Sequence, residues 1–114
     1  MSLNVKTRKV DEAVVVDMQG RLTIGEPVLL LRETIRVLVN DGIRHFVLNL
    51  GDVSYIDSSG LGELVSLFTS VRNKQGDVKL LNLTTKARDL LQMTKLLTVF
   101  DTYDDENKAL AAFK

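Results

Sequence analysis

The chain contains no cysteine, so disulfide bonds and thiolate metal sites are excluded. A single proline and seven glycines in 114 residues argue against a disordered chain. No apolar run approaches the length of a membrane-spanning helix, and the first residues lack the charged and then apolar layout of a secretion signal. These absences predict a cytoplasmic domain that does not insert into a membrane.

Neither sign of charge is in excess, because fifteen basic residues balance fifteen acidic ones. A chain with zero net charge has no electrostatic reason to bind nucleic acid or an anionic membrane surface. Apolar residues make up 45% of the chain, enough for one core, and the length suits one compact domain. We therefore predict a single domain over residues 1–114. No prediction depends on residues 1–3, since such opening residues can derive from an expression vector.

The hydrophobic pattern predicts strands that alternate with helices. Strands are expected at residues 3–8 and 13–18, joined as a hairpin, then at 45–50, at 78–83 and, as a brief extended piece, at 99–100. Helices are expected to begin at Pro27, after residue 56, at Thr84 or Thr85, and at Thr102, which forms a capping-box pattern with Asp105. Repeated strand–helix–strand units imply an α/β fold: a mainly parallel sheet of four or five strands with an N-terminal hairpin strand and about four flanking helices.

Each expected helix has one apolar stripe. The stripes comprise Val28, Leu31, Ile35, Leu38 and Val39; Leu61, Leu64, Val65, Phe68 and Val71; Leu90 and Leu91; and Ala109, Leu110 and Phe113. Residues 20–25 are predicted to be a connection, and Gly42 to cap the first helix in the left-handed conformation. Leu29, Leu30 and Val37 widen the first stripe, which favours a broad buried face over a patch for another protein.

The stretch Asp57-Ser58-Ser59-Gly60-Leu61-Gly62 stands where ligands and reactive groups collect in such sheets, beyond the carboxyl end of a strand. It does not fit a hydrolase nucleophile elbow, which needs glycine where Asp57 and Leu61 stand. The only histidine, His45, opens a strand at the opposite edge, so we interpret it as structural rather than as a catalytic base.

Other ligand-binding patterns are also missing. No glycine-rich run ends in Gly-Lys-Ser/Thr, and Val65 stands where the dinucleotide fingerprint needs glycine or alanine. The residues after the first parallel strand, Met18-Gln19-Gly20, are not the clustered acids of a phosphoaspartate receiver domain. The scattered carboxylates have no metal-ligand spacing. We therefore predict that the protein is not an enzyme and uses no cofactor or metal.

The serines have two explanations. Asp57 or Ser58 can simply cap the helix, which is worth about 1 kcal/mol. Gly60 and Gly62, however, each cost a helix up to about 1 kcal/mol relative to alanine, and they make sense if another protein approaches the backbone or an added group needs room. A phosphate here would carry a charge of about −1.5 to −2 beside the positive end of the helix dipole. Together with an acidic patch of Asp52, Asp57 and Glu63, that charge would repel a partner that fits the unmodified turn.

The turn from Asp57 to Gly62 resembles the signature turn of STAS domains, as found in bacterial anti-sigma-factor antagonists. The resemblance extends over nearly the whole chain: the opening hairpin, Gly20-Arg21-Leu22, the strand at residues 47–50, and the Ala109-Leu110 helix. It implies a single small STAS-like domain with a binding function controlled by phosphorylation.

In this family an anti-sigma factor, itself a serine kinase, phosphorylates the second serine of the turn, which maps to Ser59. The unphosphorylated antagonist binds the anti-sigma factor, and a separate phosphatase resets the modified form. Asp57, Ser58, Gly60, Leu61 and Gly62 match the rest of the docking turn. Thr23 stands where many members carry an acid; we expect Thr23 to lie beside the turn and to contact the partner, so this departure bears on the partner's identity.

Two alternatives remain. The same domain can serve as a scaffold or accessory module of a signalling complex or of a lipid transporter. An enzymatic role would require turnover that depends on Ser59, although no base, metal set or phosphate loop accompanies the serines.

Overall fold

The computed structural model of the protein describes residues 3–114. Five strands form one mixed sheet in the order β1-β2-β3-β4-β5. They are β1 (Leu3–Val10), β2 (Ala13–Leu22), β3 (His45–Ile56), β4 (Asp77–Leu81) and β5 (Asp101–Tyr103). The helices are α1 (Glu26–Asn40), α2 (Ser58–Arg72), α3 (Thr85–Met93) and α4 (Glu106–Ala111). Among the strand pairs within residues 3–114, only β1–β2 is antiparallel, so the predicted α/β fold with a mainly parallel sheet is confirmed.

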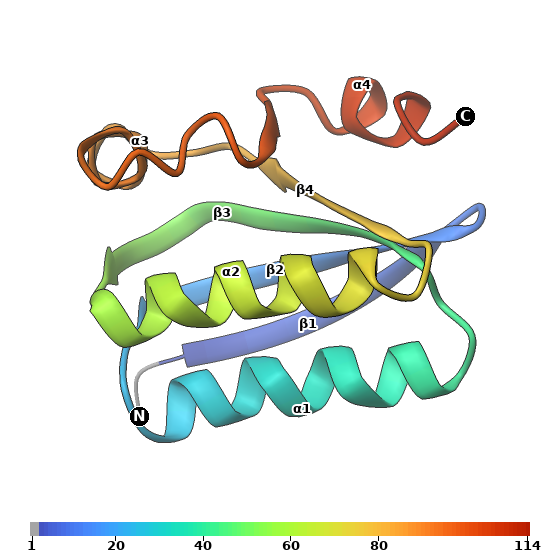
Figure 1. Cartoon of the computed structure of the whole chain (residues 1–114), viewed down its shortest axis with the longest axis horizontal. Coiled ribbons are helices and arrows are strands. Elements are labelled where there is room, and N and C mark those ends of the chain that lie inside the picture. Colours follow the sequence, from blue (N-terminus) through green and yellow to red (C-terminus); the bar gives the residue numbers. More distant parts are fainter. Residues whose placement is uncertain (1–2) are drawn as a thin grey trace.

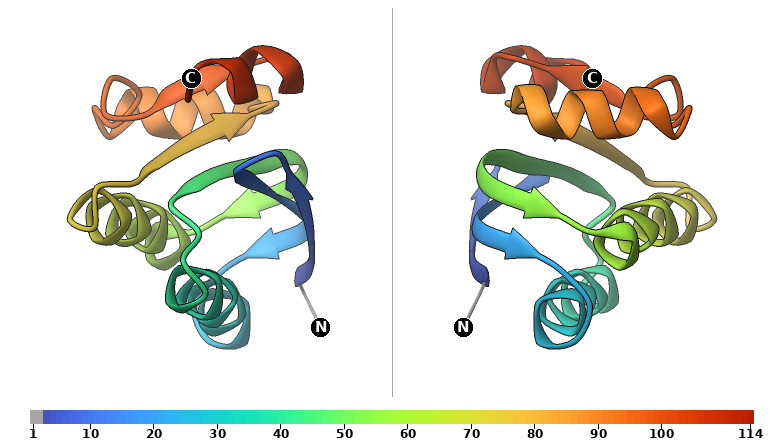
Figure 2. Two further views of the ribbon diagram at one scale, coloured as in Figure 1. Left: turned by 90° about the vertical axis from the view of Figure 1, so that its right-hand side faces the viewer. Right: turned by 90° about the vertical axis from the view of Figure 1, so that its left-hand side faces the viewer.

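The sheet is covered on both faces. Alternate strand residues such as Phe46, Leu48 and Leu80 belong to a large core shared with α1, α2 and α3. The intervening Val47 and Leu81 belong to a smaller cluster under α4. Figures 1 and 2 show that α1 and α2 lie side by side and run in the same direction, with their amino ends at one end of the molecule. That end is the carboxyl edge of the parallel strands.

The predicted helical stripes are largely confirmed. Val28, Leu31 and Ile35 of α1 are buried, and Leu38 and Val39 pack against the same core. In α2, Leu61, Leu64 and Val71 are buried, while Val65 and Phe68 are partly buried. Gly42 follows α1 with a φ of 96°, as its proposed capping role requires.

Two boundaries near the serines were predicted wrongly. Residues 20–25 are not all connection, because β2 runs to Leu22 through irregularities in its register with β3. Likewise β3 continues past Leu50 to Ile56, where it pairs with Leu22. Exposed residues in these extensions interrupt the apolar pattern. The strands continue because their backbones pair with each other, and such pairing cannot be recognised from the sequence.

The carboxyl-terminal elements are shifted from their predicted places. The last strand is β5, at residues 101–103 rather than 99–100, and Thr102 lies in it opposite Leu80 instead of capping a helix. Asp105 alone caps α4, since its side chain accepts hydrogen bonds from the amides of Asn107 and Lys108. Residues 1–3 were expected to be possible vector residues, and two of them, Met1 and Ser2, lie outside the described residues. Leu3 is buried in the core.

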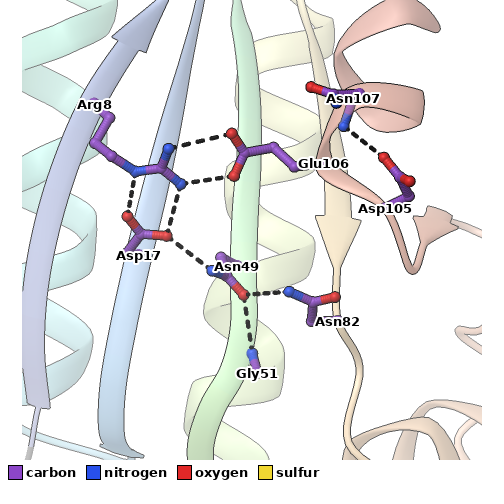
Figure 3. A network of polar contacts seen from close by, with 8 residues as sticks. All are labelled: Arg8, Asp17, Asn49, Gly51, Asn82, Asp105, Glu106 and Asn107. Carbon is purple, nitrogen blue, oxygen red and sulfur yellow. Dashed lines mark hydrogen bonds and ion pairs between the residues drawn. The ribbon is translucent and has the colours of Figure 1, made fainter.

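A polar network crosses the face of the sheet beneath α4 (Figure 3). Arg8 of β1 donates to Asp17 of β2 at 2.6 Å and to Glu106 of α4 at 2.7 Å. Asn49 donates to Asp17, and Asn82 donates to Asn49. The hydrogen bonds from Arg8 are the main reason why the pKa of Asp17 lies below its usual value. The network connects α4 to the hairpin through Glu106, an acid in the first turn of that helix.

Candidate functional site

The serine turn, residues 57–62, joins β3 to the first turn of α2. Asp57 is the N-cap residue: its Oδ1 accepts a hydrogen bond of 2.8 Å from the amide of Gly60, and its carbonyl accepts one of 2.9 Å from Leu61. Of the two candidates for the cap, the structure therefore selects Asp57 over Ser58. Ser58 is exposed and Ser59 is half-buried. Neither serine hydroxyl is needed for the cap.

The second oxygen of Asp57 binds the segment between β2 and α1. Asp57 Oδ2 accepts a hydrogen bond of 2.9 Å from the amide of Ile24, and the amide of Asp57 donates to the carbonyl of Leu22 at 3.3 Å. The bonds from the amides of Ile24 and then Gly60 hold the pKa of the Asp57 carboxyl below its ordinary value. Thr23 lies between Leu22 and Ile24, which are both hydrogen-bonded to Asp57, so its predicted position beside the serine turn is confirmed.

The two glycines of the turn have different surroundings. A β-carbon on Gly60 would stand 2.2 Å from the carbonyl oxygen of Leu22. We predicted that position 60 is glycine in order to leave room for a partner. That reason is wrong, because the space is taken by the backbone of β2. Gly62 is exposed, and a β-carbon there would meet no atom within 4 Å. Only Gly62 has open space for another molecule.

The acidic patch expected around the serines is not formed. Glu63 is only 4% exposed, and its Oε1 accepts hydrogen bonds from Arg32 of α1 at 2.8 and 3.1 Å. The carboxylate of Asp57 is engaged by two backbone amides, which leaves Asp52 as the exposed acid of the three. Glu63 falls on the same side of α2 as the buried Leu64 and Leu67, a helical position that could have predicted its burial.

Apolar side chains surround the serine turn instead. Ile24 is 73% exposed and Tyr55, which precedes the turn on β3, is 48% exposed. Leu61 contributes to the core rather than to this surface. A groove of about 420 Å³ adjoins the turn between the end of β3 and α3, and its apolar lining includes Val53, Tyr55, Ile56, Ala87, Leu90 and Met93. Ile24 was not among the predicted contact residues, because a single apolar residue between Thr23 and Gly25 forms no recognisable pattern in the sequence.

The first helix also carries exposed apolar residues. Leu29, Leu30 and Val37 are 56%, 39% and 45% exposed, so the preferred interpretation of a broad buried face is wrong. Leu29 and Leu30 lie near the amino end of α1, which Figure 1 shows at the same end of the molecule as the start of α2. Leu30 and Val37 line a groove together with Thr7 of β1.

His45 lies at the other edge of the sheet, as expected. Its ring stacks on Phe113 with 4.6 Å between ring centroids, which is a packing role. Within residues 3–114, no three His, Asp or Glu side chains gather in a way that could hold a metal ion. In the same part of the chain, none of the helices combines the length and apolar character needed to cross a bilayer.

Comparisons with known proteins agree with this fold. The sequence profile of the STAS domain matches residues 4–109. The anti-sigma-B factor antagonist of Bacillus subtilis is 33% identical over 102 residues, which cover 89% of this chain and 91% of that protein. An anti-sigma factor antagonist from Mycobacterium paratuberculosis has a similar structure, with a TM-score of 0.83 at 23% identity over 97% of this chain and 93% of its own. The Bacillus cell fate determinant SpoIIAA in its phosphorylated form matches with a TM-score of 0.77 at 23% identity, over 97% of this chain and all of its own.

Proposed function

This chain belongs to the STAS domain family, and on that premise we propose that it is an anti-sigma-factor antagonist that phosphorylation of Ser59 switches off. Its similarity to anti-sigma factor antagonists in sequence and fold supports the first part. The partner is an anti-sigma factor that is also a serine kinase, and a phosphoserine phosphatase reverses the modification. We take residues 1–114 as one domain that acts in the cytoplasm without binding nucleic acid, a cofactor or a metal.

One observation carries the proposal: Asp57 caps α2, which leaves the hydroxyl of Ser59 unneeded by the fold. Ser59 is the second residue of α2, where backbone amides lack partners and the helix dipole is positive. A phosphate would therefore be tolerated there without unfolding the turn. The related fold of SpoIIAA is known in a phosphorylated form, which supports the same conclusion.

The charge that a phosphate adds at Ser59 supports the proposed loss of binding. Before modification, the exposed residues next to Ser59 include Ser58 and Gly62 of the turn and Ile24 of the adjoining segment beside Thr23, and none of these carries a charge. Phosphate changes the net charge of the protein from zero to about −2 and places that charge inside the contact. A partner that fits the unmodified turn must then take the added charge out of water, which is costly.

A second candidate is a scaffold or accessory module of a signalling complex or of a lipid transporter. The exposed Leu29, Leu30 and Val37 of α1 favour it, because a binding surface along α1 need not involve the serines. Purification of the protein from its native cells distinguishes the two candidates. A co-purifying kinase supports the antagonist, and co-purifying transporter or scaffold subunits support the second candidate.

The direct test is phosphorylation by the cognate kinase with ATP, followed by peptide mapping. We expect phosphate on Ser59 in the original chain and in Ser58→Ala, and none in Ser59→Ala. Phosphate only on another residue, or none on the original chain, contradicts the proposal. Turnover of a small substrate that disappears in Ser59→Ala would revive the enzymatic alternative.

A further inference from the structure

Ser59 and Glu63 lie on the same edge of α2, one helical turn apart. Side chains four residues apart on a helix have β-carbons separated by about 5–6 Å. The same edge continues through Ser66 and Ser70, which with Glu63 line a groove of about 260 Å³ against α1. Ser59 is therefore at the amino end of the edge of α2 that faces α1.

Glu63 is a buried acid that depends on one exposed cation. The Glu63 side chain is 3% exposed, whereas that of Arg32 is 56% exposed. Nε and Nη2 of Arg32 both donate to the same oxygen of Glu63, Oε1. The remaining N–H groups of the guanidinium face away from this contact and can serve a second acceptor.

A phosphate on Ser59 would place a charge of about −1.5 to −2 one turn from the Glu63 carboxylate. Like charges at this spacing repel. Glu63 cannot turn into water to relieve the repulsion, because it is held between α1 and α2. A planar guanidinium can donate to a carboxylate and to a phosphate from different edges at the same time.

We propose that Arg32 is the positioning residue for the phosphorylated state: it donates to the phosphate on Ser59 while it keeps its bond to Glu63. The phosphate is then held along the groove between α1 and α2 rather than free in solvent. Arg32 thereby connects the modified turn to α1, the helix that carries the exposed Leu29 and Leu30. This inference rests on the proposed function only in assuming that Ser59 carries phosphate.

The other charged groups near this edge allow a matched control. Arg36 lines the same groove one turn farther along α1, but its guanidinium is bound to the exposed Glu33. Lys74 lies at the far end of the groove, beyond the carboxyl end of α2, and Asp57 at the near end is engaged by the amides of Ile24 and Gly60. Arg36→Gln removes the same charge from the same groove without touching Glu63.

The test uses full-length protein with phosphoserine incorporated at position 59 during synthesis, so it does not require the kinase. The ionisation of the phosphate is followed by phosphorus NMR as a function of pH. Free phosphoserine has its second midpoint at about pH 6, and we expect a lower midpoint in the original chain. Arg32→Gln should raise that midpoint by about one pH unit, and Arg36→Gln should change it much less.

Because Arg32→Gln leaves a buried carboxylate without its cation, Arg32→Gln/Glu63→Gln is measured in parallel. Glu63→Gln alone should lower the midpoint, since it frees Arg32 for the phosphate. The inference is overturned if Arg32→Gln and Arg36→Gln have the same midpoint. It is also overturned if Glu63→Gln and Arg32→Gln/Glu63→Gln have the same midpoint. Failure of a kinase to modify Ser59 would instead count against the proposed function alone.

Discussion

The carbonyl oxygen of Leu22 lies 2.2 Å from the point that a β-carbon of Gly60 would occupy. The same oxygen accepts the hydrogen bond from the amide of Asp57 at 3.3 Å. The last residue of β2 and the first turn of α2 are therefore in contact backbone to backbone, closer than any side chain would permit. This contact fixes the position at which Ser59 is presented.

The two glycines of the turn should respond oppositely to alanine. Gly60→Ala forces β2 and α2 apart and should lower the free energy of unfolding by about 1–3 kcal/mol. Gly62→Ala adds a methyl group in open space and should raise that free energy by up to about 1 kcal/mol. Urea unfolding measures both. Equal effects of the two substitutions would show that the close approach of Leu22 is not what requires glycine.

Asp57 should make part of the stability depend on pH. Its pKa is lower in the folded protein than in the unfolded chain, so its contribution is present above the unfolded value of about 4 and is lost as the pH falls through the folded value. Asp57→Asn keeps the shape but removes the charge and one of the two oxygens that accept hydrogen bonds from Ile24 and Gly60. The melting temperature of the original protein should exceed that of Asp57→Asn at pH 7, and the difference should shrink below about pH 4. A difference that does not change with pH contradicts this account of the cap.

Ile24 should be a major apolar contact for the partner. It is 73% exposed and sits beside the serine turn, so Ile24→Ala should leave stability almost unchanged and weaken partner binding by about tenfold, or about 1.4 kcal/mol. Val37→Ala is the control, because Val37 is exposed near the carboxyl end of α1, away from the turn. Loss of binding in Val37→Ala but not in Ile24→Ala would place the partner on α1 and favour the scaffold alternative.

Substitution of Ser59 should separate charge from the loss of the hydroxyl. Ser59→Asp adds a negative charge and should weaken the complex with the anti-sigma factor, whereas Ser59→Ala should preserve it. Ser58→Asp is the control for charge at the neighbouring exposed residue, and we expect a smaller effect from it. Isothermal titration calorimetry gives the affinities. Strong binding by Ser59→Asp would contradict the account, and weak binding by Ser59→Ala would mean that the hydroxyl itself makes the contact.

The fold was predictable where burial leaves a regular pattern. The apolar spacing of α1 and the run at the start of β3 predicted those elements correctly, because their buried side chains produce a regular apolar pattern. The carboxyl half of β3 and the short β5 were missed or displaced, because backbone pairing with a neighbouring strand sustains them and their side chains are partly exposed.

The serine turn was predictable as a location, but its contacts were not. Asp57 and the neighbouring serines indicate a helix start at the carboxyl edge of the sheet, and that is where the turn lies. The partner of Glu63 is 31 residues away on another helix, and the requirement for glycine at position 60 comes from the carbonyl of Leu22. Such tertiary contacts determine the structural role of a residue, but they cannot be recognised from the local sequence pattern.

The most direct test of the proposed switch compares one protein in two states. The affinity of the cognate anti-sigma factor is measured for the unmodified chain and for the chain with phosphoserine at position 59, at the same pH and salt concentration. Taking the phosphate charge out of water in the contact costs several kcal/mol, so we predict that the modified chain binds at least about 100-fold more weakly. Equal affinities for the two forms would contradict the account.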